Sequence, residues 1–85
     1  QYELALDALT RAALEQGMTG EILNGMGTAN LGLGRLGQSE KLLRRAVEVE
    51  PEWAEVWNNL GVVLMERGQL TEAQNVFHKA YALDD

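Results

Sequence analysis

Residues 57–80 read WNNLGVVLMERGQLTEAQNVFHKA and predict two α-helices joined by a tight turn. In the first part, apolar or small side chains recur at i, i+3, i+4 and i+7, a spacing that places them on one helical face. These are Trp57, Leu60, Gly61 and Leu64. Gly68 then favours the end of the helix, because glycine readily adopts the positive φ of a helix C-terminus. A second apolar face follows, formed by Ala73, Val76, Phe77, Ala80 and Leu83.

Two threonines indicate where helices start. Thr71 and Gln74 have the spacing of a capping box, in which each side chain satisfies a free backbone N–H of the first helical turn. We therefore expect the second helix of this segment to begin at Thr71. Thr19 follows Gly17 and is expected to cap a helix that begins near residue 20.

The same pattern occurs 34 residues earlier in the chain. When the sequence is shifted by that distance, residues 20–51 align with residues 54–85 without a gap. The identical pairs are Glu21/Glu55, Asn24/Asn58, Gly27/Gly61, Gly34/Gly68, Leu36/Leu70 and Ala46/Ala80. Residues 1–18 align only with the second half of a unit. The sequence thus predicts an all-α chain with five helices in two and a half units, at 1–18, 20–51 and 54–85.

Composition excludes several classes of function. Seven Lys and Arg residues against 13 Asp and Glu residues give a net charge of −6, which disfavours binding to nucleic-acid phosphates. The chain has no cysteine and one histidine, so it lacks the usual ligands of a metal cluster. No apolar run reaches the ~18–20 residues of a membrane span. We expect a non-catalytic module without metal or cofactor, and the lack of cysteine fits the cytoplasm and a bacterial periplasm equally well.

The repeat resembles the tetratricopeptide repeat (TPR), whose 34-residue unit carries W-x2-L-G-x2-Y, then A-x3-F and P. The last unit follows this pattern at residues 57–64 and at Ala73-x3-Phe77. The middle unit follows it more loosely, with Leu23, Met26, Gly27, Asn30, Ser39, Leu43, Ala46 and Pro51 at the corresponding places. Asn30 departs most, because the family prefers a large apolar ring there. The resemblance implies a right-handed solenoid of antiparallel helix pairs, in which the first helix of each pair lines a concave groove.

In the resembling family this groove receives an extended peptide or a helix of a partner. The residues expected to line it lie on the two first helices, away from the apolar face. They are Glu21, Asn24, Gly25, Thr28, Leu31, Glu55, Asn58, Asn59, Val62 and Met65. Some family members grip acidic C-terminal tails of chaperones with Lys, Arg and Asn at these places. Because Glu21 and Glu55 would repel such a tail, we expect a neutral or basic partner segment.

Glycine is concentrated in the middle unit. Gly25 and Gly32 fall inside its first predicted helix, and each costs roughly 0.5–1 kcal/mol relative to alanine. We therefore predict that this helix is the least stable one in the chain.

An alternative function is structural. The apolar faces of residues 2–13 and 76–83 lack neighbours in a stack of five helices, so they could drive self-association within a larger repeat protein. The run LNGMG at residues 23–27 also resembles TPR proteins of bacterial Tad-type pilus assembly, which implies a role in secretion or pilus assembly.

Enzymatic function is disfavoured. Residues 32–37 match the dinucleotide-binding pattern G-x-G-x-x-G, but that site requires a β-strand immediately before it. Residues 24–31 follow the helical pattern instead, so we expect these glycines to form a turn between two helices.

Overall fold

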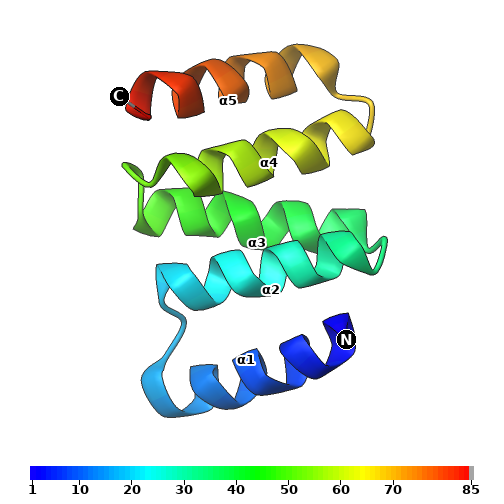
Figure 1. Cartoon of the computed structure of the whole chain (residues 1–85), viewed down its shortest axis with the longest axis vertical. Helices are drawn as coiled ribbons and strands as arrows, with labels where there is room; N and C mark the ends of the chain where they lie inside the picture. Colours follow the sequence, from blue (N-terminus) through cyan, green and yellow to red (C-terminus); the bar gives the residue numbers. More distant parts are fainter. Residues whose placement is uncertain (85) are drawn as a thin grey trace.

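The computed structural model describes residues 1–84, which form five α-helices and no β-strand. In chain order these are α1 (Tyr2–Gln16), α2 (Gly20–Gly32), α3 (Leu36–Val49), α4 (Ala54–Glu66) and α5 (Leu70–Leu83). Each helix packs against the next one in sequence, and the two termini lie at opposite ends of the stack (Figure 1). The predicted all-α repeat architecture with five helices is confirmed. Asp85, the last residue of the predicted last unit, lies outside the described residues.

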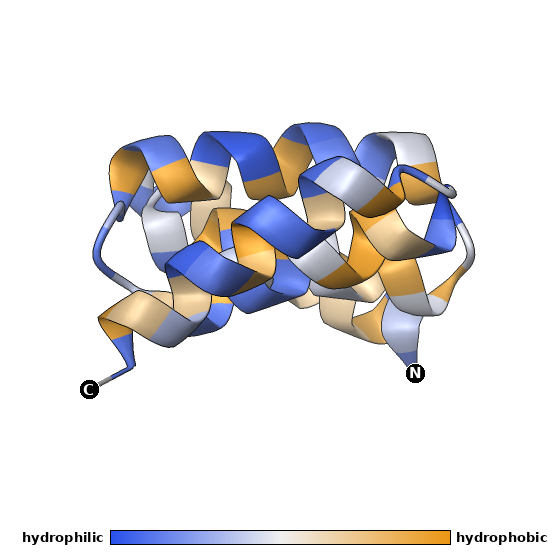
Figure 2. Ribbon diagram, turned by 90° about the horizontal axis from the view of Figure 1, so that it is seen from above, coloured by the Kyte–Doolittle hydropathy of each residue, from blue (hydrophilic) through white to orange (hydrophobic). Residues whose placement is uncertain are grey.

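The core lies between the pairs α2–α3 and α4–α5. Figure 2 shows apolar and polar residues interspersed along the helices, as expected for helices that bury one side. The buried cluster consists of Leu23, Leu43, Ala46, Val47, Val56, Leu60, Val63, Leu64, Ala73 and Val76. Each buried Leu or Val side chain stabilises the fold by about 1.5–3 kcal/mol relative to an exposed one. Helix α1 contributes no buried residue.

A glycine in each pair lets its two helices approach closely. A Cβ atom on Gly27 would lie 2.6 Å from Cγ of Leu43, and one on Gly61 would lie 2.6 Å from Cε1 of Phe77. Gly61 follows Gly27 by 34 residues, and Phe77 follows Leu43 by the same distance, so the two pairs pack through equivalent contacts.

The two turns inside the pairs also share one geometry. Gly34 and Gly68 have φ angles of 78° and 81°, values that favour glycine. The backbone N–H that follows each glycine closes the turn: Arg35 donates to the carbonyl of Asn30 (2.8 Å), and Gln69 donates to that of Leu64 (2.9 Å). The prediction that Gly68 ends a helix is confirmed.

The two capping predictions have different outcomes. Oγ1 of Thr19 accepts a hydrogen bond from the backbone N–H of Ile22 (3.1 Å), which confirms Thr19 as the N-cap of α2. The capping box at Thr71 is wrong, because α5 already begins at Leu70. The turn at Gly68 returns the chain to helical geometry at once, so Gln69 is the N-cap and its carbonyl accepts from the N–H of Ala73 (3.0 Å).

The glycines within α2 make room for α1. A Cβ atom on Gly25 would lie 3.0 Å from Cδ2 of Leu9, and one on Gly32 would overlap the ring of Tyr2. Both glycines therefore allow α1 to pack closely against α2, which offsets part of their low helix propensity. That α2 is the least stable helix stays a prediction. Helix α1 buries no residue, which favours α1 over α2 as the least stable helix.

Candidate functional site

The first helices of the two repeats lie against each other, whereas the second helices do not. Nδ2 of Asn59 in α4 donates a hydrogen bond to Oδ1 of Asn24 in α2 (2.9 Å), so two short side chains span the distance. No Cα pair of α3 and α5 lies within 8 Å, and the long side chain of Arg44 reaches Glu72 of α5 (2.8 Å). Because α2 and α4 approach more closely than α3 and α5, the stack bends toward the α2–α4 side. We call this inner side the α2–α4 face.

The residues predicted to line the groove differ in exposure. The exposed ones are Glu21, Glu55, Asn58 and Met65. The half-buried ones are Gly25, Thr28, Leu31, Asn59 and Val62, and Asn24 is buried. All ten lie on α2 or α4, but only part of the set is free to contact a partner.

Several of these side chains already have partners within the chain. Asn24 and Asn59 bind each other, Oγ1 of Thr28 donates to the backbone carbonyl of Gly25 (3.0 Å), and Gly25 itself lies against Leu9. The amide groups of Asn24 and Asn59 therefore hold α2 and α4 together and are not simply available to a peptide backbone.

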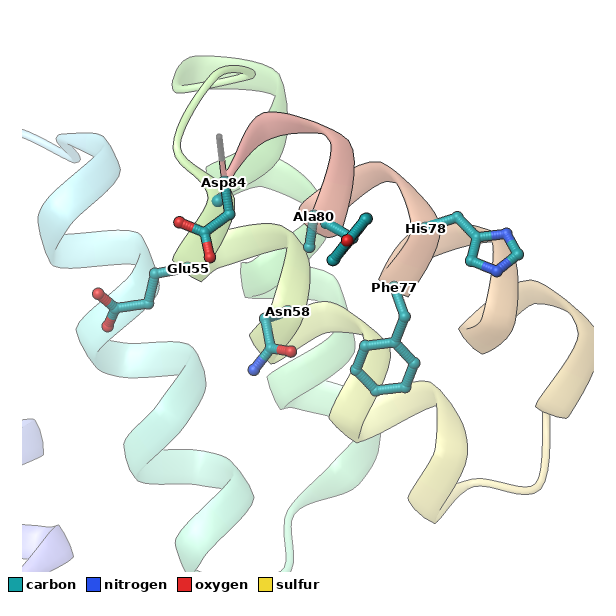
Figure 3. A pocket seen from close by; sticks show the side chains of 8 residues that line it. Glu55, Asn58, Phe77, His78, Ala80 and Asp84 are labelled. Carbon is teal, nitrogen blue, oxygen red and sulfur yellow. The ribbon is translucent and has the colours of Figure 1, made fainter.

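Asn58 also borders a second surface. Together with Glu55, another predicted groove residue, it lines an open hollow of about 630 Å³ on the far side of the last repeat (Figure 3). The opposite wall includes Phe77 and Ala80 of α5 and Asp84 directly after this helix, while His78 points away from the other labelled side chains. The residues that line it are Ala54, Glu55, Asn58, Phe77, His78, Ala80, Tyr81 and Asp84. The sequence pattern does not predict this hollow.

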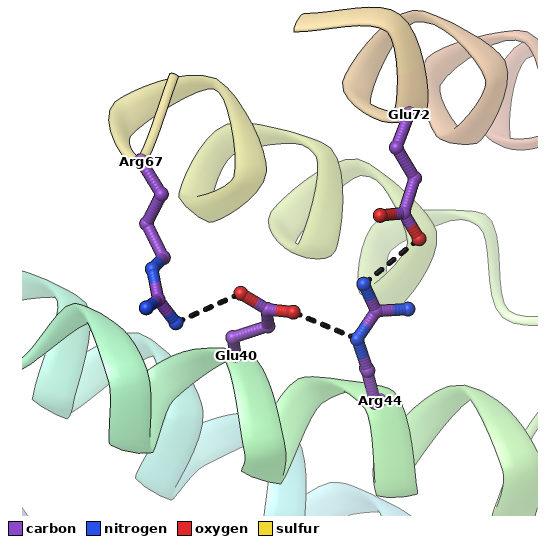
Figure 4. A network of polar contacts seen from close by, with 4 residues as sticks. All are labelled: Glu40, Arg44, Arg67 and Glu72. Carbon is purple, nitrogen blue, oxygen red and sulfur yellow. Dashed lines mark hydrogen bonds and ion pairs between the residues drawn. The ribbon is translucent and has the colours of Figure 1, made fainter. Parts of the chain in front are cut away.

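A network of charges joins the repeats on the outer side. Oε1 and Oε2 of Glu40 accept hydrogen bonds from Arg67 and Arg44, each at 2.9 Å, and Arg44 also donates to Glu72 (Figure 4). The hydrogen bond to Glu72 raises the pKa of the Arg44 guanidinium, with a further contribution from Glu40 and an opposing one from burial. The network links α3 to both helices of the next repeat and stays accessible to solvent.

Asn30 is a buried residue whose side chain is only partly hydrogen-bonded. Its Nδ2 donates to the carbonyl of Met26 (2.8 Å), but its buried Oδ1 has no hydrogen-bond partner. The position corresponds to Leu64 in the last repeat, so the departure from the family pattern leaves a carbonyl in the core.

The glycine motif lies at a corner between helices, as expected. Gly32 ends α2, Gly34 forms the turn and Gly37 is the second residue of α3. The segment before the motif is helical, so the strand that a dinucleotide site requires is replaced by α2. Among residues 1–84, no three His, Cys, Asp or Glu side chains gather as metal ligands.

In the described part of the chain, every helix is too short or too polar to span a membrane.

Family models and curated relatives that match this chain all carry the same description, tetratricopeptide repeat. Models described as tetratricopeptide repeat match residues 20–52 and residues 54–85, which together make up more than half of the chain. The chain is 42% identical over 43 residues to human tetratricopeptide repeat protein 5, which covers 51% of this chain and 10% of that protein. It is 44% identical over 52 residues to mouse tetratricopeptide repeat protein 7B, which covers 61% of this chain and 6% of that protein. The chain thus spans a tenth or less of these relatives.

Solved structures of MamA have the same arrangement of helices. A MamA structure labelled MSR-1 superimposes with a TM-score of 0.86 and 25% identity over 98% of this chain and 48% of MamA. A MamA mutant gives a TM-score of 0.89 and 25% identity, over 100% of this chain and 62% of that one. These structures support the helical solenoid derived above from contacts between helices.

Proposed function

Because the chain belongs to the tetratricopeptide repeat family, we propose that it binds a peptide or a helix of a partner protein along the α2–α4 face. Repeats of this family form protein-interaction scaffolds and are generally non-catalytic. In this proposal, residues 20–51 and 54–85 are the two complete repeats and residues 1–18 belong to a partial one. The observation that supports it best is the close approach of α2 and α4, which makes their shared face the inner surface of the stack.

The chemistry of the α2–α4 face favours a neutral or basic segment. Glu21 and Glu55 are both exposed at the same position of successive repeats, so their carboxylates form an acidic row. Beside it, Met65 is 47% exposed and Val62 is half-buried, which offers apolar contact one turn apart. Carboxylates on an accessible surface attract basic partners and repel acidic ones. A basic segment with flanking apolar residues fits both features.

A displayed peptide library selected on this chain tests the proposal. The selected peptides are then measured against a double variant, Glu21→Lys with Glu55→Lys, and a control, Glu48→Lys with Glu52→Lys, which changes the net charge equally at other exposed positions. We expect basic peptides that bind the first variant about tenfold more weakly than the control, a loss equivalent to about 1.4 kcal/mol. Equal weakening by both variants would reject the α2–α4 face as the binding surface.

Self-association is a second candidate, supported by exposed apolar residues at both ends of the stack. Leu14 and Tyr81 are each 83% exposed, and Leu4 is 71% exposed. If these residues join copies of the chain, the mass measured by light scattering will fall on dilution, and Leu4→Lys with Leu14→Lys will shift the equilibrium toward the monomer. The resemblance of residues 23–27 to Tad-type pilus assembly proteins makes such an assembly the first setting in which to seek partners.

A further inference from the structure

A hollow of about 470 Å³ opens on the outer side of the stack, where the middle repeat meets the last one. The first half of α3 and Arg67, directly after α4, form its walls, and the lining residues are Gly37, Gln38, Glu40, Lys41, Arg44 and Arg67. We call this surface the outer hollow. Each helix packs on the next one along the stack, so a further repeat would lie beyond α1 or α5 and would leave the outer hollow open.

Cations are concentrated around the outer hollow, although the chain carries a net charge of −6. Lys41, Arg44 and Arg67, three of the seven Lys and Arg residues, line it. Glu40 is the one carboxylate among the lining residues, which leaves an excess of two positive charges. One positive charge still remains when Glu72, which pairs with Arg44 from α5, is included. The outer hollow therefore attracts anions, whereas the α2–α4 face carries an acidic row.

Glu40 positions the two guanidinium groups. Its side chain is 14% exposed, and its carboxylate lies between Arg44 and Arg67 (Figure 4). Nε of Arg44 and Nη1 of Arg67 donate to Glu40, and Nη2 of Arg44 donates to Glu72. Nη1 of Arg44 and Nη2 of Arg67 form no hydrogen bond within residues 1–84 and stay available as donors. Because both side chains are already held in place, an anion that binds them loses little further entropy to side-chain ordering.

Lys41 supplies a charge that this network does not use. It is exposed and forms no ion pair within the described part of the chain. It precedes Arg44 by three residues, a spacing that brings the two side chains to neighbouring positions on one face of α3. The rise between them is about 4.5 Å along the helix axis. The ammonium group and the free donors of Arg44 can therefore contact neighbouring acidic groups of one ligand.

We propose that the outer hollow binds an acidic segment of a partner protein, whose Asp or Glu carboxylates contact Lys41, Arg44 and Arg67. Both arginines already bind carboxylates at 2.8–2.9 Å in this structure. The small excess of positive charge suits singly charged groups, and a phosphate group with a charge of about −2 would be repelled more strongly by Glu40. Because the outer hollow is open to solvent, the attraction is weak and depends on salt.

A second copy of this chain could also offer carboxylates. Residues 48–55 carry four exposed glutamates, Glu48, Glu50, Glu52 and Glu55. This contact would join two different surfaces, so each pair of copies would keep one free outer hollow and one free acidic segment. Such heterologous contacts continue into open chains unless their rotation closes a ring. An acidic segment of a different protein fills the outer hollow without this consequence.

A labelled peptide in which Asp alternates with Gly is the probe, and the same peptide with Asn in place of each Asp is its control. Fluorescence anisotropy at low salt measures binding to the whole chain. We expect a Kd of about 0.1–1 mM for the acidic peptide and binding at least about tenfold weaker for the control. In 1 M NaCl the screening length falls to about 3 Å, and binding of the acidic peptide should weaken by a similar factor.

Variants of the chain locate the binding. Lys41→Glu reverses a charge in the outer hollow, and Arg11→Glu changes the net charge equally at an exposed position of α1, which does not contact α3. We expect Lys41→Glu to weaken binding of the acidic peptide about fivefold and Arg11→Glu to weaken it less than about twofold. Arg67→Gln, which removes one guanidinium group, should weaken it about threefold. Since Lys41 is exposed and unpaired within residues 1–84, Lys41→Glu should leave the helical circular dichroism signal unchanged.

Three results would overturn the inference: no binding of the acidic peptide at low salt, equal binding of the Asn control, or equal losses for Lys41→Glu and Arg11→Glu. A peptide with phosphoserine at the Asp positions tests the kind of anion, and tighter binding of this peptide than of the acidic one would reject carboxylates as the ligand. Light scattering tests the remaining occupant, since copies that associate in the original chain and separate in Lys41→Glu would identify a second copy. The probe is acidic, whereas the segment proposed for the α2–α4 face is basic, so failure at one surface leaves the other proposal standing.

Discussion

The middle repeat and the last repeat have the same helix packing and the same turn, but they differ in their neighbours and in the residues of their cores. Both have a glycine under a large side chain and a glycine turn with the same hydrogen bonds. The middle repeat is enclosed by α1 on one side and α4 on the other, whereas the last repeat has a neighbour on one side among residues 1–84. The core of the middle repeat holds Ser39 and Asn30, where the last repeat has Ala73 and Leu64.

The difference in core residues shows that a repeat tolerates a buried polar side chain where that side chain can form a hydrogen bond. Oγ of Ser39 donates to the backbone carbonyl of Gly27 (2.7 Å), so its burial is compensated. Asn30 is only half compensated, because its Oδ1 stays unpaired. The two repeats can therefore be compared by exchanging the residues at which they differ.

Exchange at the Asn30 and Leu64 positions should have the largest effect. Leu64→Asn places an amide in a fully buried site and should lower the free energy of unfolding by about 3 kcal/mol. Asn30→Leu removes the unpaired carbonyl and should raise it by about 1 kcal/mol. Urea denaturation of both variants measures the two changes, and equal destabilisation would mean that the middle repeat is adapted to its asparagine.

Alanine substitutions at Gly27 and Gly61 should show whether the side chain that contacts each glycine can move aside. We expect Gly27→Ala to cost about 2 kcal/mol, because the buried Leu43 cannot move aside. Gly61→Ala should cost about 1 kcal/mol or less, since Phe77 borders the open hollow between α4 and α5 and can rotate toward it, while alanine also favours the helix. Thermal denaturation gives both values, and a larger loss at Gly61 would reverse this ranking of the two neighbours.

Exchange of the buried hydroxyl should have a moderate effect. Ser39→Ala removes the bond to Gly27 and should cost about 1 kcal/mol in unfolding free energy. Ala73→Ser should be nearly neutral, because the new hydroxyl can reach the carbonyl of Gly61 in the same way. A loss above about 2 kcal/mol for Ala73→Ser would show that the last repeat cannot form this bond.

Glu40→Gln should have the smallest effect, since it introduces the residue found at the equivalent Gln74. It breaks the ion pairs to Arg44 and Arg67 at a partly exposed site, and we expect a loss of about 0.5 kcal/mol at low salt. The loss should become smaller in 1 M NaCl, where the screening length falls to about 3 Å. Glu48→Gln, the same change at an exposed position of α3, should have no effect and serves as the control.

Local sequence patterns predicted the helices well, but they did not predict which of the proposed groove side chains are exposed and without a partner within the described residues. The spacing of Leu60, Gly61 and Leu64 and the turn at Gly68 were sufficient for the helix pair. The predicted groove residues lie on α2 and α4, but the bond between Asn24 and Asn59 could not be foreseen because it joins two repeats. The start of α5 at Leu70 was missed because the preceding turn, not the threonine, fixes where helical geometry resumes.

The sequence by itself determined the period, the number of helices and the small residues that allow them to pack, because these depend on spacing along one helix. Only the tertiary structure decided which of the polar groups are free. Asn24 and Asn58 are identical in the sequence pattern, yet one is buried against α4 and the other lies open beside Tyr81. The physical reason is that exposure depends on the neighbouring repeat, and a position in a repeating sequence does not specify whether that neighbour is present.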